Sequence, residues 1–207
     1  MRIADLFRGA REFFVGRPSF SQAMKLGGVS ADRALDGFER LLGPTIRQEG
    51  EKSLGTFERS YLTARESGND ESRRKYVTRC LPLLPPREQV RAKRRLGIDD
   101  RGNVQEGYAA LQGDLAAGGQ QAADALQHLE EQHGAEIRAG GKDGTNVFWD
   151  LHSLVKMAGN SETTGAYRRQ FMRMLPEPER AAVGSEVSEI VANEILFPSR
   201  MRDKGSS

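Results

Sequence analysis

The stretch GNDESRRKYVTRCLPLLPPRE, residues 68–88, is followed 91 positions later by GNSETTGAYRRQFMRMLPEPE, residues 159–179. Shifting the chain by 91 residues aligns 18–90 with 109–181 without a gap, and about a quarter of the aligned pairs are identical. Ordinary amino-acid usage would give about four or five identical pairs by chance. The sequence therefore predicts a tandem duplication of a unit of roughly 73 residues.

The matched residues are those that mark the ends of helices. In SADRALDGFERLLG, Ser30 is a candidate N-cap and Gly43 is a candidate left-handed residue at the C-terminal end. The next helix is expected to start near Leu54 and to stop at Gly68. We predict that Gly68 and its aligned partner Gly159 both end helices with positive φ, because glycine carries no Cβ to oppose that conformation.

The repeated stretch also predicts a helix between two turns. Asp70 and its counterpart Ser161 are candidate N-caps, and the first of these helices should run until Pro85 breaks it, with Pro86 opening another. No segment alternates apolar and polar residues over the length of a strand. The sequence thus predicts an all-α fold, either two small helical bundles or one continuous helical array.

The expected organisation begins with an amphipathic N-terminal helix (residues 1–17) and a first repeat unit (18–90). A basic connection and the start of the second unit follow (91–108), then the second repeat unit (109–181). A C-terminal helix with a disordered tail ends the chain (182–207). The N-terminal stripe consists of Ile3, Leu6, Phe7, Ala10, Phe13 and Phe14. Its helical spacing favours packing on the first bundle, and binding to a partner or to a membrane surface is the alternative.

Composition bounds the class of protein. The chain has 207 residues, of which 37% are hydrophobic, and no run of 18 apolar residues that would span a bilayer. Charges run through the first 20 residues, so we expect no Sec-type signal. The single cysteine, Cys80, excludes an internal disulfide framework and fits a reducing compartment. We expect a cytoplasmic protein, or one delivered to another cell without a Sec-type signal.

Few residues suggest chemistry. His128, His133 and His152 all lie in the second unit. The first two are five residues apart, and this spacing does not place them on the same face of a helix as metal ligands would be. We therefore expect neither a metal site nor a cofactor. Cys80 aligns with Phe171 on an expected apolar face, which favours a buried structural thiol over a nucleophile activated by a histidine.

The strongest electrostatic feature is a set of cations in and before the run VRAKRRLG: Arg73, Arg74, Lys75, Arg91, Lys93, Arg94 and Arg95. We expect these side chains to be solvated and to form a patch for an acidic protein partner, with nucleic-acid phosphates or anionic lipid as the alternative. The aligned stretch AAVGSEVS carries no positive charge. Leu6 and Phe7 in the N-terminal stripe, and Trp149, are further candidates for partner binding.

These observations favour a non-enzymatic interaction protein of bacterial type, such as an effector or adaptor, that binds a partner protein through helical surfaces. Two alternatives stay open. One is binding of nucleic acid or of an anionic membrane through the basic half of the chain, where residues 1–108 hold 21 Lys and Arg against 15 Asp and Glu. The other is an enzyme whose dispersed site has no recognisable motif.

Overall fold

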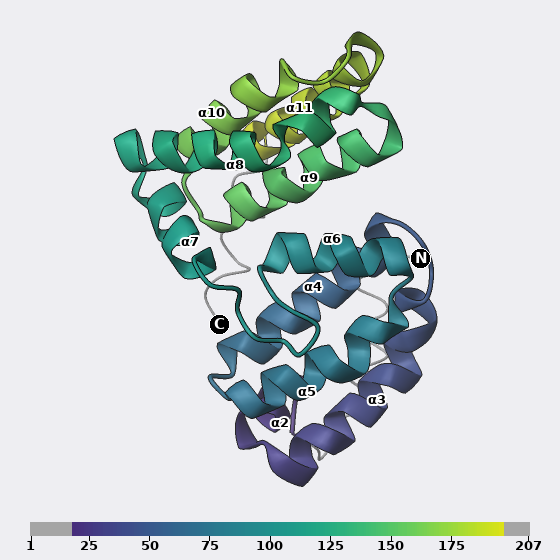
Figure 1. Cartoon of the computed structure of the whole chain (residues 1–207). Helices are drawn as coiled ribbons and strands as arrows, with labels where there is room; N and C mark the ends of the chain where they lie inside the picture. Colours follow the sequence, from purple (N-terminus) through teal and green to yellow (C-terminus); the bar gives the residue numbers. More distant parts are fainter. Residues whose placement is uncertain (1–17, 197–207) are drawn as a thin grey trace. The chain divides into compact units, whose positions relative to one another are not determined.

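The computed structural model describes residues 18–196, with the side chains of residues 18–191 (Figure 1). This part of the chain is helical, and its only β-type pairing is an isolated antiparallel bridge between Ile98 and Val104. The all-α prediction is therefore confirmed for these residues. The chain divides into two compact units, Met1–Tyr108 and Ala109–Ser207. Within the described residues, no helix has the length and apolar character needed to cross a membrane.

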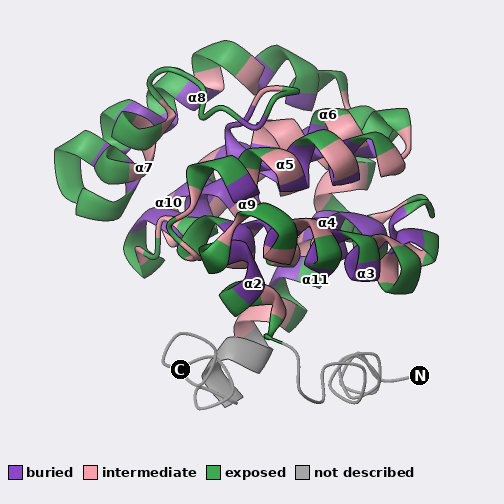
Figure 2. Cartoon of the chain, turned by 90° about the horizontal axis from the view of Figure 1, so that it is seen from below, coloured by how far each residue is buried: buried purple, intermediate pink, exposed green. Residues whose placement is uncertain are grey.

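Unit 1 packs short helices around one aliphatic and aromatic core. Its helices are α2 (Phe20–Leu26), α3 (Gly28–Ile46), α4 (Glu51–Glu66), α5 (Asp70–Cys80), the 3-10 helix η1 (Leu81–Leu83) and α6 (Pro86–Leu96). Buried and exposed residues interleave along these helices, as Figure 2 shows for α3 and α5. This pattern is that of helices that pack against the core on one side and meet solvent on the other.

Two consecutive glycines lie at the junction of α2 and α3. Gly27 has φ +71° and Gly28 has φ +50°, a backbone region in which side chains other than glycine are strained. The prediction that Ser30 is the N-cap is wrong, since α3 begins at Gly28 with Gly27 as its N-cap. The N-cap therefore lies three residues earlier than predicted, at Gly27.

The start of α4 and the end of α3 also differ from expectation. The helix α3 does not stop at Gly43 but continues through Pro44 to Ile46. Ile46 is fully buried in the core, so the additional turn removes its side chain from water. The helix α4 begins at Glu51, before the expected Leu54, because a left-handed glycine immediately precedes it.

The turn between α4 and α5 is formed as predicted. Gly68 has φ +74° and Gly159 has φ +82°, which confirms the prediction of positive φ at both positions. The N-cap of α5 is Asn69 and not Asp70, because the Asn69 side-chain oxygen accepts the backbone N–H of Ser72 at 3.0 Å. Asp70 instead lies in the first turn, where the helix dipole favours a carboxylate.

The centre of unit 1 is the buried ring of Tyr76 in α5. Its hydroxyl donates to the backbone carbonyl of Phe57 in α4 at 2.9 Å. Its ring centroid lies 6.3 Å from that of Phe20, 5.4 Å from that of Phe38 and 5.3 Å from that of Phe57. One side chain therefore contacts α2, α3 and α4. Burial holds the pKa of Tyr76 well above its usual value, so the hydroxyl keeps its proton.

Unit 2 is also built from α-helices. They are α7 (Tyr108–Ala117), α8 (Gly119–Ala139), α9 (Gly141–Met157), α10 (Ser161–Met172) and α11 (Glu177–Leu196), of which α7 begins on the last residue of unit 1. A glycine pair, Gly118 and Gly119 with φ +76° and +58°, separates α7 from α8. Asn160, and not the predicted Ser161, caps α10 by accepting the N–H of Thr163 at 3.0 Å.

The core of unit 2 is centred on Tyr167 in α10. Its hydroxyl donates to the backbone carbonyl of Phe148 in α9 at 2.7 Å. The ring centroids of Phe148, Phe171 and His152 lie 5.5, 4.3 and 6.0 Å from that of Tyr167. Burial raises the pKa of Tyr167 well above its usual value, so this hydroxyl also stays a donor.

In each unit, a glutamate carboxylate also binds the backbone at the start of a helix. Glu88 of α6 accepts the N–H of Gly50, just before α4, at 3.0 Å. Glu179 of α11 accepts the N–H of Gly141, the first residue of α9, at 2.8 Å. The first turn of a helix leaves N–H groups without partners, and the acceptor here comes from 38 residues away. These hydrogen bonds fix α6 on α4 and α11 on α9.

Replacing Gly68 by Val should lower the free energy of unfolding by about 1 kcal/mol or more, because a β-branched residue is strained at positive φ. A Cβ at this position meets no atom within 4 Å, so the cost is conformational and not steric. Gly55 within α4 is the matched control, because a Cβ there is also unobstructed and its backbone is helical. Urea unfolding followed by circular dichroism gives the comparison. Equal stability of Gly68→Val and Gly55→Val would contradict the prediction.

Candidate functional site

Two of the cations chosen from the sequence lie inside unit 1. The exposed fraction is 6% for Arg91 and 4% for Arg95, both on α6. The expectation that these side chains are solvated is wrong, because α6 turns this face toward α4 and its carboxylates. Arg95 binds both oxygens of Glu51 through one nitrogen, at 2.9 and 3.0 Å, and Glu58 through the other, at 3.2 Å. Arg91 pairs with Glu51 as well.

Glu51 is the carboxylate that the two buried arginines share. Burial acts to raise the pKa of Glu51, but the guanidinium groups of Arg95 and Arg91 outweigh that effect and hold the pKa below its usual value. The Glu51 side chain is itself 61% exposed, and Arg95 also pairs with Glu58, so solvent limits what the loss of Glu51 alone would cost. This part of the basic run therefore serves packing of α6 on α4.

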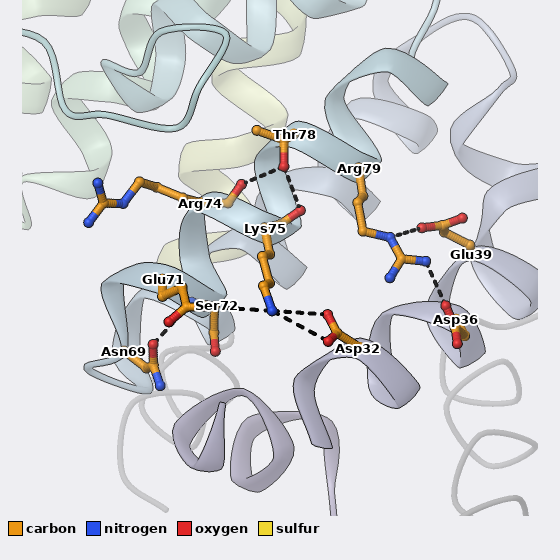
Figure 3. Close-up of polar contacts among 10 residues, drawn as sticks. All are labelled: Asp32, Asp36, Glu39, Asn69, Glu71, Ser72, Arg74, Lys75, Thr78 and Arg79. Atoms are coloured by element: carbon orange, nitrogen blue, oxygen red, sulfur yellow. Dashed lines mark hydrogen bonds and ion pairs between the residues drawn. The ribbon is translucent and has the colours of Figure 1, made fainter. Parts of the chain in front are cut away.

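The cations of α5 pair with carboxylates on α3 and α5. The Lys75 ammonium lies 3.3 Å from Asp32 of α3 and 3.4 Å from Glu71 (Figure 3). The hydrogen bond to Asp32 raises the pKa of Lys75. Arg73 lies 3.3 Å from Asp70. Each of these cations is thus engaged by a carboxylate of its own unit.

Arg79, one turn further along α5, binds two carboxylates of α3. Its Nε donates to Glu39 at 2.6 Å and one terminal nitrogen donates to Asp36 at 2.7 Å (Figure 3). Hydrogen bonding to Asp36 and Glu39 raises the pKa of Arg79. In unit 2 the amide of Gln170 donates to Glu130 at 2.7 Å, so a neutral donor takes the place of the guanidinium.

The other cations of the run are more open to solvent. Lys93, half-buried on α6, lies 2.9 Å from Asp100, and Arg94 is half-buried beside it. Arg74 is exposed, and its Nε donates to the backbone carbonyl of Asp70 at 3.4 Å. The structure therefore does not bring the seven predicted cations together as one solvated patch.

The apolar candidates divide in two. Leu6 and Phe7 lie outside the described residues. Trp149 is half-buried on α9, with its ring edge-on to Phe148 at 5.3 Å and to His152 at 5.4 Å between centroids. Trp149 is thus partly covered by ring contacts within its own unit and partly accessible to solvent.

The surroundings of the histidines and of the Cys80 thiol indicate packing roles and not chemical ones. Among the described residues, no group of three or more His, Cys, Asp and Glu is placed to hold a metal ion. His152 is buried, and its Nε2 accepts a hydrogen bond from Nε of Arg168 at 3.0 Å. Cys80 is also buried, and burial together with the nearby Glu39 raises its pKa to about 12. A thiol in such surroundings is a poor nucleophile near neutral pH.

Among the described residues of unit 1, the most exposed large apolar side chains lie at the corner between α2 and α3. Leu26 is 69% exposed and Val29 is 66% exposed, and they stand on either side of the glycine pair. Sequence reasoning missed this corner, since apolar residues near helical spacing are usually core. Two apolar side chains flanking Gly27 and Gly28 are the one sequence signal that separates them from the core stripe.

The corner is held by Asn69, the N-cap of α5. Its side-chain amide donates to the carbonyl of Lys25 at 3.3 Å, and a Cβ on Gly27 would lie only 2.7 Å from the same nitrogen. Glycine is thus required both by the backbone angle and by the close approach of this amide. The backbone between Leu26 and Val29 is thus constrained both by the positive φ of Gly27 and by the hydrogen bond from Asn69.

The equivalent corner of unit 2 has the same backbone but no large apolar side chains. Asn160 donates to the carbonyl of Ala116 at 3.1 Å, and a Cβ on Gly118 would also lie 2.7 Å from the asparagine nitrogen. The residues at the aligned positions are Ala117 and Gln120, and both are exposed. The apolar corner, defined by Leu26 and Val29, is therefore particular to unit 1.

Comparison of the chain with models of protein families, with curated proteins and with solved structures finds no match. The geometry of the chain itself is thus the basis for a functional proposal.

Replacing Glu51 by Gln should lower the free energy of unfolding by about 1 kcal/mol near neutral pH, because a charged hydrogen-bond acceptor is lost at a partly exposed position. The pKa of Glu51 is lowered by folding, so its contribution is complete above the unfolded pKa. That contribution is lost as the pH falls through the folded pKa, and the two proteins should converge in acid. Urea unfolding at a series of pH values measures this difference.

The control is Lys142→Gln, at the aligned position of unit 2, which should leave the difference from the wild type small at every pH. A deficit for Glu51→Gln that persists unchanged in acid would show that the carboxylate charge is not its cause.

Cys80 should not react with a thiol reagent such as DTNB in the folded chain at mildly alkaline pH, because the thiol is buried and its pKa is raised to about 12. One thiol per chain should react after unfolding in guanidinium. Since Cys80 lies in unit 1 and the single tryptophan, Trp149, lies in unit 2, thiol reactivity and indole fluorescence monitor the units separately. Fast labelling without denaturant would refute the structural role of this thiol.

Proposed function

We propose that the chain is a non-enzymatic protein-interaction module that binds a partner protein through the apolar corner of unit 1. The observation that carries this proposal is the exposure of Leu26 and Val29, two large apolar side chains that flank a glycine pair held by the Asn69 side chain. Apolar anchors on a fixed backbone bind with a small loss of conformational entropy. An effector or adaptor that acts by binding alone would use a surface of this kind.

The partner that fits this surface is a protein with a shallow apolar pocket and a polar rim. Lys25 and Gln22 are exposed on α2 next to the anchors, and they supply polar contacts around an apolar centre. Trp149 in unit 2 is a second candidate anchor, because its side chain is only half-buried. The N-terminal Leu6 and Phe7 belong to the segment that leads into α2.

We also infer that residues 18–90 and 109–181 descend from one duplicated unit. Supporting this are hydrogen bonds at aligned positions: the tyrosine hydroxyl to the phenylalanine carbonyl, the asparagine amide to the carbonyl before the glycine pair, and the glutamate to the start of the next helix. After a duplication, surface residues that differ between the two copies are those through which the copies can acquire different roles. Leu26 and Val29, against Ala117 and Gln120, are such residues.

Binding of nucleic acid or of an anionic membrane through the basic run is the alternative, and the ion pairs argue against it. Arg91 and Arg95 are buried against carboxylates, and Arg73 and Lys75 are paired within unit 1. Cations engaged in this way release few counterions when a polyanion approaches, so the electrostatic gain is small. An enzyme with a dispersed site is the second alternative, and Cys80 and His152 do not supply its chemistry.

A photo-crosslinking amino acid at position 26 or 29 should yield one discrete crosslinked partner in cells that produce the protein in its natural setting. The same amino acid at positions 117 and 120, the aligned corner of unit 2, should give no such product. The crosslink should disappear when the neighbouring anchor is changed, for example Val29→Gln with the probe at position 26. Equal crosslinking from both corners, or from neither, would overturn the assignment of the corner as the binding surface.

A further inference from the structure

Five serine and threonine side chains are buried among the described residues, and they divide into two groups. Ser53, Thr56 and Thr164 donate to backbone carbonyls at 2.8, 2.8 and 2.9 Å. Ser72 of α5 and Thr163 of α10 are 1% and 3% exposed, and their hydroxyl oxygens have no hydrogen-bond partner in the described part of the chain. These two hydroxyls lie 91 residues apart, at aligned positions in the first turn of their helices.

A buried hydroxyl without a partner is costly, because it has given up its hydrogen bonds with water and gained none in return. Buried polar groups therefore almost always bind protein or an ordered water. In unit 2 the carbonyl three residues before Thr163 is that of Asn160, and it already accepts both the N–H and the hydroxyl of Thr164, at 3.0 and 2.9 Å. Both of its lone pairs are thus in use, and the Thr163 hydroxyl needs a partner from elsewhere.

In unit 1 the Ser72 hydroxyl faces the glycine pair at the apolar corner. A Cβ built on Gly27 would lie 3.7 Å from Oγ of Ser72 and 2.7 Å from Nδ2 of Asn69, so these two polar atoms are close to one point. Figure 3 shows both side chains at the start of α5. The Asn69 amide carries two N–H groups, and one of them donates to the carbonyl of Lys25 at 3.3 Å. The hydroxyl and the second N–H are two polar partners, the number that a buried water requires.

Unit 2 repeats the asparagine and the buried hydroxyl. One N–H of the Asn160 amide donates to the carbonyl of Ala116 at 3.1 Å, and a Cβ on Gly118 would lie 2.7 Å from the same nitrogen. The Thr163 hydroxyl lies more than 4 Å from that Cβ position, farther than Ser72 lies from the equivalent point in unit 1. The features that the two units share are therefore the asparagine amide and the unpartnered hydroxyl on one helical turn.

We propose that each unit binds one internal water molecule at this turn, between the hydroxyl of Ser72 or Thr163 and the asparagine amide that holds the glycine pair. The water accepts the second N–H of the asparagine and exchanges a hydrogen bond with the hydroxyl, which satisfies both groups. In unit 1 this water supports the backbone that carries the apolar corner. The inference does not depend on the proposed function, since its test involves no partner.

The direct test is magnetic relaxation dispersion of water ¹⁷O on the full chain, which detects internal waters that stay bound for longer than the protein takes to tumble. The amplitude should fall by about one water per chain in Ser72→Ala and again in Thr163→Val. The matched controls are Ser53→Ala and Thr164→Val, which remove buried hydroxyls that bind carbonyls and should leave the amplitude unchanged. Circular dichroism checks that each variant is folded.

Equal amplitudes in the wild type, Ser72→Ala and Thr163→Val would overturn the proposal. A decrease in one of these two variants alone would overturn it for the other unit. A variant that does not fold is replaced by cross-relaxation between water and protein protons in the wild type. Ser72 and Thr163 should then show signals at the water frequency that Ser53 does not, and their absence would also overturn the proposal.

Stability supplies a second measurement in Thr163→Val, which keeps the shape of the side chain and a similar helix propensity. If the hydroxyl binds a water, its loss removes a satisfied hydrogen bond, and the midpoint of urea unfolding should move to lower urea. If the hydroxyl has no partner, the valine removes a buried polar group at no loss. An unchanged or raised midpoint would therefore count against the water in unit 2.

Discussion

A tyrosine hydroxyl that is buried at the centre of each unit has to find an acceptor, because a polar group left without one in the core costs free energy. Tyr76 finds it at the carbonyl of Phe57, and Tyr167 finds it at the carbonyl of Phe148. Both carbonyls lie inside a helix, so each hydrogen bond sets the position of one helix along its neighbour and its rotation about its own axis. In unit 1 the bond places α5 on α4, and in unit 2 it places α10 on α9. The rings of α2 and α3 then pack around Tyr76 within 6.3 Å. The orientation of the α2–α3 corner follows from this arrangement, since Phe20 lies on α2 and Phe38 on α3.

The helical architecture was predictable from the sequence because helix ends depend on local chemistry. Gly68 and Gly159 take positive φ as expected, and Pro86 opens α6. The errors arose where a distant contact outweighed the local preference. Ser30 is a good N-cap by residue type, but a glycine pair held by the amide of Asn69 makes the turn earlier. Gly43 is a good helix stop by residue type, but burial of the residue three positions later extends the helix.

The candidate surface was harder to predict because charge and exposure are not local. Arg91 and Arg95 share a basic run, yet their partners Glu51 and Glu58 lie about 40 residues earlier, and only the packing of α6 on α4 brings them together. The spacing of seven residues between the two glutamates, which places them on one helix face, was the available signal. For the apolar corner the sequence offered only the two glycines that Leu26 and Val29 flank, because whether an apolar residue faces the core depends on the turn beside it.

The ion pairs of α6 bear on the fidelity of folding. Chains with two units of related pattern can misfold when a helix of one unit docks in the bundle of the other. Most core positions would tolerate such an exchange, because the apolar residues are similar in kind. If α6 docked on α9 in place of α4, however, Arg91 and Arg95 would face Lys142 where Glu51 belongs, leaving buried charge uncompensated at a cost of about 3–5 kcal/mol. Pairs that contribute modestly to the native state thus discriminate strongly against the wrong one, and the charge difference between Glu51 and Lys142 keeps each set of helices with its own unit.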